Sequence, residues 1–407
     1  MKFFFPDSQD LVSPTYDFVH DEYSPLRVRQ RDDRYAHEVL SEPAYDGVLV
    51  SKAVVDGSVQ GAGKYSMPQR QRIYRMGVRA FFRLPKTTST MGDCGSFTYA
   101  NEPEPPYSVG EVLDFYEECG FDAGVSIDHV ILGYLKHGQP ISDDWYRRQQ
   151  TTLECAQKYL DETQSRNSTV EPVGAAQGWD PISYSESVAE LQKMGYKRIA
   201  LGGMIALKTP DILDCLEAID DIRADDVGLH LLGISRIENF DDFRSHGVTS
   251  FDSTSAFRQA FMDDRDNYHT VDTTYAAIRI PQVEGNVTLK RAILSGRVRQ
   301  AEAISGERSA LVALREYDAG KVSATAALES VLEYERIFID PKKKSYEAQY
   351  RRTLEAAPWR SCRCGLCADH GIEIAVFRGT ERNKRRGFHN LATLRKKIAL
   401  RLEGVQQ

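Results

Sequence analysis

Cysteine is scarce in this sequence, and long apolar runs are absent from it. The 407 residues include 7 cysteines, and this small, odd number argues against a disulfide framework and favours a reducing, cytoplasmic setting. No stretch approaches the roughly 18 consecutive apolar residues of a membrane helix, so we expect no membrane association. The apolar run Phe3–Phe5 is too short for the core of a signal peptide.

A large excess of one charge is also lacking. The chain has 52 Lys and Arg residues against 59 Asp and Glu residues, which gives a formal net charge of −7. Its 41% hydrophobic and 27% charged residues are typical of a folded globular protein and exclude a disordered or collagen-like chain. A mildly acidic protein is not expected to coat nucleic acid over its whole surface, so local basic clusters matter more.

Between about residues 45 and 255, short β-branched runs alternate with longer amphipathic stretches. Strands joined by helical crossovers form parallel βαβ units. Seven or eight such units favour an α/β fold of the (β/α)8 TIM-type barrel class over an open, doubly wound sheet, although periodicity alone does not exclude the latter. We expect strands at residues 47–51, 78–84, 124–128, 170–177, 198–203, 228–233 and 248–252.

Three helices have recognisable starts or lengths. Ser108 and Glu111 form a capping box that opens a helix ending near Cys119. Residues 143–164 have helical length and few helix breakers. Thr209-Pro210 is typical of an N-cap followed by proline at the first helical position.

The alternation stops after Asp252, and the remaining chain differs in character. Residues 285–340 are mostly helical by pattern, and 340–344 is predicted to be a loop or linker. We therefore expect a barrel with a helical insertion and a C-terminal zinc-binding module that carries a basic helix. The predicted segments are 1–260, 261–350 and 351–407, in that order.

Polar residues or glycine pairs stand at or after the ends of several predicted strands. In a barrel, catalytic groups lie where the strands end and the βα loops begin. Turn-forming residues are common at strand ends, but five such positions in succession would converge on one rim. They are Asp93, which follows the 78–84 run, Asp128, Gln177, Gly202-Gly203 and Asp252.

Two carboxylates on such a rim suit glycosidic chemistry. One attacks the anomeric carbon while the other transfers the proton of the leaving group, about 5 Å away in a retaining mechanism. A carboxylate nucleophile forms a covalent glycosyl intermediate that a second acceptor can resolve. The same pair fits an O-glycosidase equally well.

A cysteine-rich turn near the C-terminus predicts a metal site. Cys362, Cys364 and Cys367 lie within six residues, and His389 follows 22 residues after the third cysteine. Three thiolates and one imidazole form a closed tetrahedral shell, so we expect one structural zinc ion per chain. His370 is an alternative fourth ligand, three residues after Cys367.

Basic residues are clustered despite the negative total. Residues 64–92 contain seven basic residues and no acidic one, and residues 378–401 contain nine basic residues and a single Glu. Charge runs are usually solvated faces, but one run here precedes Asp93 and the other lies in the metal module. We expect both to contact phosphates, through Arg70, Arg72 and Arg75 in the first and Lys384, Arg385 and Arg386 in the second.

Several short motifs together resemble the tRNA-guanine transglycosylase superfamily, over roughly residues 75–255 and 360–400. They are Gly92–Phe97, Ser126–Asp128, Ala176–Gly178, Leu201–Gly203, His230–Ile234, Phe251-Asp252, the Cys-x-Cys-x2-Cys run and His389–Leu391.

The resemblance implies a role for each rim residue. Asp252 would be the nucleophile at the ribosyl C1′ carbon, and Asp93 the general acid and base beside it. An aromatic side chain would stack on the base. The pocket residues implied are Asp128, Gln177, Gly202 and Gly203, with Phe97 as the stacking residue.

Two departures distinguish this chain from the tRNA enzymes. The run Asp93-Cys94-Gly95-Ser96-Phe97-Thr98 replaces their usual Asp-Ser-Gly-Gly, and 110 residues separate Asp252 from Cys362. This pattern looks like the DpdA-type branch, DNA-guanine transglycosylases that insert 7-deazaguanine bases such as preQ0 into DNA.

That branch implies a pentosyltransferase with DNA and a 7-deazaguanine base as partners, and in bacterial systems an ATPase partner protein. Three alternatives stay open at this point. They are an RNA enzyme of the same superfamily, a non-catalytic nucleic-acid-binding subunit with a degenerate barrel, and an ordinary O-glycosidase. The zinc module and the basic runs count against the last.

Overall fold

A computed structural model describes residues 1–7, 10–57, 63–136, 139–338 and 345–404, so the linker predicted at 340–344 lies outside the described residues. The chain forms two compact units. We call Met1–Ser8, Tyr45–Thr254 and Arg401–Gln407 the barrel unit, and Gln9–Ala44 with Ser255–Leu400 the second unit. Residues 9–44 thus belong to the same unit as most of the C-terminal part of the chain. None of the helices in the described ranges has the length and hydrophobicity of a membrane span.

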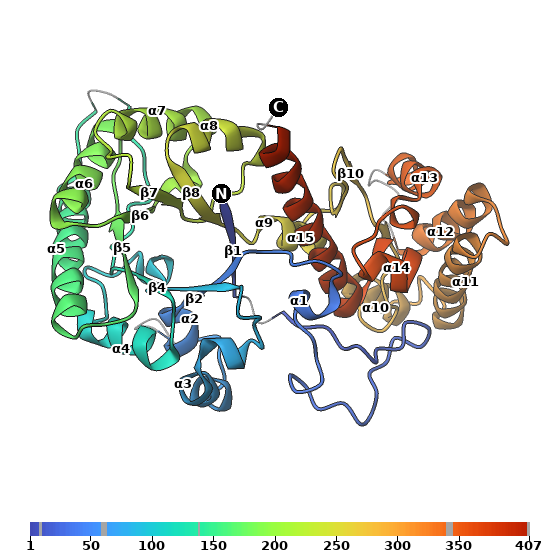
Figure 1. The fold of residues 1–407 in the computed structure, drawn as a ribbon. Helices are drawn as coiled ribbons and strands as arrows, with labels where there is room; N and C mark the ends of the chain where they lie inside the picture. Colours follow the sequence, from blue (N-terminus) through green and yellow to red (C-terminus); the bar gives the residue numbers. More distant parts are fainter. Residues whose placement is uncertain (8–9, 58–62, 137–138, 339–344, 405–407) are drawn as a thin grey trace. The chain divides into compact units, whose positions relative to one another are not determined.

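The barrel unit is a closed barrel of eight parallel strands in chain order, which confirms the predicted fold class (Figure 1). The strands are β1 (Lys2–Pro6), β2 (Gly47–Ser51), β3 (Ser89–Asp93), β4 (Ala123–Val125), β5 (Glu171–Ala176), β6 (Arg198–Leu201), β7 (Gly228–Leu231) and β8 (Val248–Asp252).

The first and third strands were not predicted. β1 closes the barrel, since Phe4 pairs with Gly47 of β2 on one side and with Asp252 of β8 on the other. The predicted strand at 78–84 is wrong, because residues 78–81 continue helix α3 (Met67–Phe81) beyond a break at Gly77, whose φ is 77°. The apolar residues of this short run recur at the spacing of a helix and not at the alternating spacing of a strand.

Helices on the connecting segments surround the barrel, as βαβ units require (Figure 1). The predicted capping box opens α4, since Glu111 N donates to Ser108 Oγ (3.3 Å) and Ser108 N donates to Glu111 Oε2 (2.8 Å). The other helices of this unit are α2 (Lys52–Asp56), α3, α5 (Asp143–Ser165), α6 (Pro181–Met194), α7 (Thr209–Asp220) and α8 (Phe240–Ser245), with α4 at Val109–Cys119.

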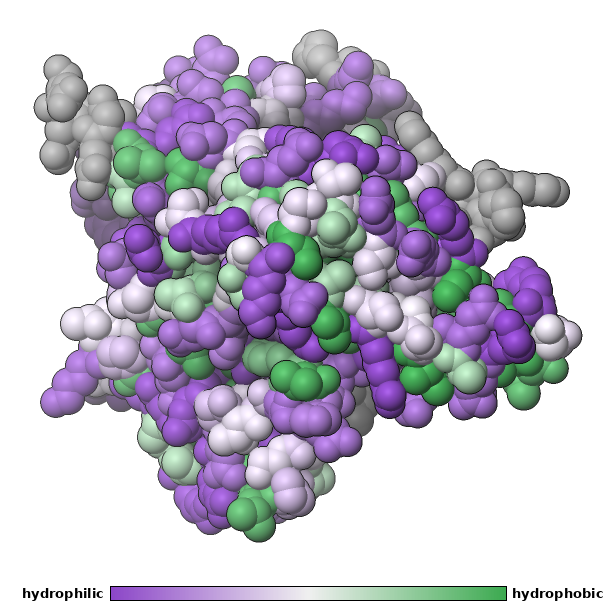
Figure 2. All heavy atoms as spheres, turned by 90° about the vertical axis from the view of Figure 1, so that its right-hand side faces the viewer, coloured by the Kyte–Doolittle hydropathy of each residue, from purple (hydrophilic) through white to green (hydrophobic). Residues whose placement is uncertain are grey.

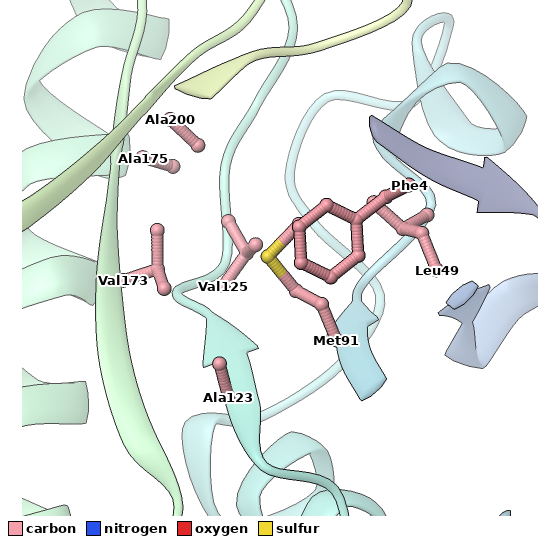
Figure 3. Close-up of a cluster of buried hydrophobic side chains, with 8 residues drawn as sticks. All are labelled: Phe4, Leu49, Met91, Ala123, Val125, Val173, Ala175 and Ala200. Carbon is pink, nitrogen blue, oxygen red and sulfur yellow. The ribbon is translucent and has the colours of Figure 1, made fainter. Parts of the chain in front are cut away.

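Apolar side chains from six strands fill the barrel interior (Figure 3). The ring of Phe4 and the thioether of Met91 lie together among smaller aliphatic side chains. The members of this buried cluster are Phe4, Leu49, Met91, Ala123, Val125, Val173, Ala175 and Ala200. A packed interior leaves the strand ends as the place where polar groups can reach solvent and substrate.

The second unit is mostly helical, as predicted for the insertion. Helices α11 (Gln300–Asp318) and α12 (Ala324–Phe338) follow the shorter α10 (Val287–Leu294). Its other elements are α1 (Ala36–Val39), α9 (Ser255–Met262), α13 (Glu347–Ala356), α14 (Leu366–His370), α15 (Gly379–Gly404), and the short strands β9 (Tyr268–His269), β10 (Thr274–Tyr275), β11 (Ile278–Arg279) and β12 (Val376–Phe377).

Candidate active site and metal site

Polar side chains occupy the carboxyl ends of the barrel strands. Ser51 ends β2 and is in register with Asp93, which ends β3, while Asp252 ends β8. Asp128 and Gln177 follow β4 and β5, and the Gly202-Gly203 pair follows β6. The structure therefore brings all the predicted pocket and catalytic positions to one rim of one barrel.

Asp93 is a half-buried acid with an unusual environment. Burial raises its pKa to about 7, and the nearby carboxylates of Asp252 and Asp128 add to the rise. Hydrogen bonds from the Ser51 side chain and the Gly95 backbone act in the opposite direction. Its Oδ1 atom is buried and has no hydrogen-bond partner in the described part of the chain. An acid that exchanges its proton near neutral pH, with a free oxygen, is suited to proton transfer.

Only one carboxylate oxygen of Asp252, Oδ1, has hydrogen-bond partners among the described residues. Its Oδ1 accepts a hydrogen bond from the backbone N–H of Gly233 (3.0 Å) and lies 3.2 Å from Nε2 of the buried His230. The other ring nitrogen of His230 is 2.8 Å from Ser250 Oγ, a hydroxyl that can donate to it. Because a carboxylate only accepts, the tautomer with its proton on Nε2 is the one that donates to Asp252. Oδ2 accepts no hydrogen bond from any described residue, which leaves it free to attack an electrophile.

The pocket residues form a connected buried network. Gln177 Nε2 donates to Asp128 Oδ2 (2.6 Å), and Ile131 N donates to Gln177 Oε1 (3.2 Å). A Cβ atom at Gly202 would lie 2.1 Å from Gln177 Nε2, and Gly203 has a φ of 74°. The glycine pair is thus required by close packing over Gln177 and by the left-handed turn.

Two neighbours of Asp93 extend this network. Cys94 Sγ donates to Asp128 Oδ1 (3.1 Å), and the buried Tyr99 hydroxyl donates to Cys94 Sγ (2.8 Å). Burial also raises the pKa of Asp128. Phe97, predicted to stack on a base, is 50% exposed and lies on the short helix after β3.

Sequence reasoning missed the contacts of Ser51, His230 and Gly233 at this rim. Ser51 is a polar residue at the end of a predicted strand, which is the same signal that identifies Asp252. His230 and Gly233 belong to a motif that carried the family resemblance, but their hydrogen bonds to Asp252 depend on the pairing of β7 with β8.

Three cysteines and one histidine of the second unit form a candidate metal centre. Their ligand atoms all lie within 4.8 Å of one another, and the Cys362, Cys364 and Cys367 sulfurs are 3.5, 3.5 and 3.4 Å from His389 Nδ1. Tetrahedral zinc with bonds of about 2.3 Å to sulfur and about 2.0 Å to nitrogen requires a sulfur–nitrogen separation of about 3.5 Å. The donor set and its spacing therefore fit zinc.

The histidine of this group is oriented by a neighbouring carbonyl. His389 Nε2 lies 2.7 Å from the backbone oxygen of His269, which fixes the ring with Nδ1 toward the sulfurs. The alternative ligand His370 is not in the group. Its ring instead packs against Phe18.

The three arginines predicted from the first basic run lie on helix α3. Arg70 forms an ion pair with Asp56 (2.6 Å) and Arg72 lies over the ring of Phe81. Arg75 is exposed. This helix therefore presents part of the predicted charge to solvent.

The second basic run does not form the predicted exposed cluster. Arg385 and Arg386 are 1% and 0% exposed. Arg385 donates to Glu381 and to the Ser13 carbonyl, while Arg386 donates to backbone carbonyls that include that of Val376 (3.0 Å). Lys384 pairs with Asp10 (3.0 Å). The prediction of phosphate contacts here is wrong for the two arginines, because residues distant in sequence cover them.

Comparison with known proteins agrees with this geometry. No protein-family model matches the chain. A curated DNA-guanine transglycosylase from Salmonella montevideo is 49% identical over 400 residues, which cover 97% of this chain and 95% of the relative. The chain therefore belongs to the DNA-guanine transglycosylase family.

Proposed function

We propose that this protein exchanges guanine in DNA for a 7-deazaguanine base such as preQ0, through a covalent intermediate on Asp252. One observation carries the proposal. Two carboxylates stand at the ends of β3 and β8, and one of them, Asp93, has a pKa of about 7 and a free buried oxygen. The relative's name supports guanine in DNA as the substrate.

The buried network supplies the base pocket. A carboxylate has about four lone-pair sites, so Asp128 can still accept from the N1–H and 2-amino edge of guanine while it holds Cys94 and Gln177. A backbone N–H of the Gly202-Gly203 turn donates to O6 of the base. Phe97 is exposed in the free protein and can stack on the flipped base.

The reaction proceeds in two displacements at C1′. Asp252 Oδ2 attacks C1′ of the flipped nucleotide, the bond from C1′ to N9 of guanine breaks, and Asp93 gives its proton to the departing base. The incoming base then loses its N9 proton to Asp93 and attacks C1′, which releases Asp252. Two inversions retain the configuration.

The metal centre and helix α3 have supporting roles in this proposal. Cys362, Cys364, Cys367 and His389 hold one zinc ion, which stabilises the second unit and takes no part in the chemistry. Arg70, Arg72 and Arg75 contact DNA phosphates. The family resemblance adds an ATPase partner protein.

The test measures guanine release from nucleic acid. Duplex DNA and tRNA, each with labelled guanine, are incubated with the protein and excess preQ0. We expect release from DNA alone and a denaturation-resistant protein–DNA adduct, and Asp252→Asn should abolish both because an amide is a poor nucleophile. Release from tRNA alone would identify an RNA enzyme. An Asp252→Asn variant that remains active would refute the covalent mechanism.

A further inference from the structure

Helix α10 and the turn after it carry a concentration of positive charge. Between Glu284 and Glu302 there is no acidic residue, whereas Lys290, Arg291, Arg297 and Arg299 are all basic. All four are exposed.

The local fold explains why these side chains face solvent. Helix α10 buries Leu289 and Ala292, so Lys290 and Arg291 lie outside its buried side. Gly296, with a φ of 72°, ends the helix, and Val298 N donates to the Ala292 carbonyl (3.2 Å). This hydrogen bond turns the chain back toward the end of α10, so Arg297 lies near the helix that carries Arg291.

Three of these cations have no counter-ion. Arg299 lies 3.5 Å from Glu302, but Lys290, Arg291 and Arg297 form no ion pair or side-chain hydrogen bond with any residue in the described ranges. This is the reverse of helix α15, where Arg382 and Arg385 are buried and paired. Exposed cations with no internal partner are available to an external anion.

We propose that Lys290, Arg291 and Arg297, the basic turn, bind the phosphate backbone of duplex DNA. The identity of the polyanion rests on the proposed function. Guanidinium groups bind phosphate in bidentate fashion, and phosphate contacts supply sequence-independent affinity. The face in Figure 2, the side of Figure 1 where α11, α12 and α13 lie, shows hydrophobic residues in small groups between hydrophilic ones.

The test compares two triple variants with equal changes in charge. The first is Lys290→Ser, Arg291→Ser and Arg297→Ser. The control is Lys158→Ser, Lys321→Ser and Arg336→Ser, which removes three exposed cations elsewhere. Binding to a fluorescent duplex without a target guanine is measured from 50 to 200 mM salt, so that catalysis does not enter. Zinc content and thermal unfolding establish that both variants are folded.

Loss of three phosphate contacts should reduce the slope of log K against log salt by about 2.7, at about 0.9 per contact. At 100 mM salt the affinity should fall roughly 10- to 500-fold. An unchanged slope, or an equal loss in the control, would overturn the proposal, and the turn would then be a solvated face or a surface for an acidic protein.

Failure of this inference is distinguishable from failure of the proposed function. The basic-turn variant should retain the wild-type kcat for guanine exchange at saturating DNA, with a raised KM. If the wild type exchanges guanine but the variant binds DNA normally, only the basic turn is refuted. If the wild type binds DNA through this turn but never exchanges guanine, only the enzymatic proposal fails.

Discussion

The barrel rim and the buried side of helix α15 both enclose ionisable groups, but these groups differ in their hydrogen-bond partners. At the rim, Asp93 Oδ1 has no partner and the pKa of Asp93 is raised to about 7 by burial. In the second unit, Arg382 donates to Asp21, to Glu373 (2.7 Å) and to the Phe18 carbonyl (2.8 Å), so each nitrogen of its guanidinium is used. Arg385 and Arg386 donate through both terminal nitrogens and leave only Nε without a partner among the described residues. Unsatisfied buried groups cost stability, and satisfied ones hold the fold together.

This difference indicates which region serves chemistry and which serves structure. Substitutions at the rim should reduce the rate of reaction and leave folding unchanged or improved. Substitutions around α15 should reduce stability and leave the rate per folded molecule unchanged. The four predictions below test that separation, and they are ordered by the size of the expected effect.

Loss of a metal ligand should have the largest effect, on folding. Structural zinc contributes about 10–16 kcal/mol in small zinc modules, because its binding free energy is also folding free energy. We expect Cys367→Ser to lose its zinc and to unfold the residues around Cys362–Cys367 and α15. Elemental analysis and hydrogen exchange measure the two losses. The matched control is His370→Ala, which should keep its zinc because that ring lies outside the ligand group; zinc loss in the control would place His370 in the shell.

At the rim, Asp93→Asn should slow exchange by about 10²–10⁴-fold, the usual contribution of a general acid and base. Single-turnover rates of guanine release measure this effect, with DNA binding as the control. The free energy of unfolding of this variant should rise rather than fall. With a folded pKa of about 7 against an ordinary value of 3.8, the native state retains a proton that the unfolded state gives up.

The stabilising contribution of the Asp93 proton is therefore complete below about pH 4 and is lost as the pH rises through 7. Denaturant unfolding of the wild type should show this fall between about pH 4 and pH 7, and Asp93→Asn should lack that component. A variant with equal activity, or with the same pH dependence of unfolding, would contradict the role assigned to this carboxyl.

The sequence predicts the barrel and much of its rim, but not the surroundings of α15. The alternation of strands and helices predicts the exact bounds of β2 and β8. It does not predict β3, because the sequence Ser-Thr-Met-Gly-Asp has little of the β-branched pattern. The burial of Arg385 was not predictable, since its carbonyl partner Ser13 is 372 positions away in the chain. Local charge density gives no information about such distant partners.

In the α15 region, Arg382→Met should reduce the free energy of unfolding by about 3–5 kcal/mol, because Asp21 and Glu373 each lose one of their two arginine partners. Each hydrogen bond to a charged group contributes about 1.5–3 kcal/mol. The rate of exchange per folded molecule should not change. Denaturant unfolding and titration of covalently trapped sites measure the two quantities. Lys396→Met, an exposed position on the same helix, is the control and should stay within about 0.5 kcal/mol of the wild type. A loss of kcat with unaltered stability would assign Arg382 to the chemistry and remove the distinction between the two regions.

The smallest effect should come from His230, a buried residue that contacts Asp252 at the rim. Its Nε2 orients Asp252 through Oδ1, and a hydrogen bond to a charged group contributes about 1.5–3 kcal/mol. His230→Leu should therefore slow adduct formation roughly 10- to 100-fold, with little change in KM for DNA. His230→Gln retains an N–H donor at a position close to Nε2 and should recover most of the rate. A purely structural role would predict instead that both variants lose stability together and that glutamine restores no activity, because neither replacement fills the space of the imidazole that packs against Phe4.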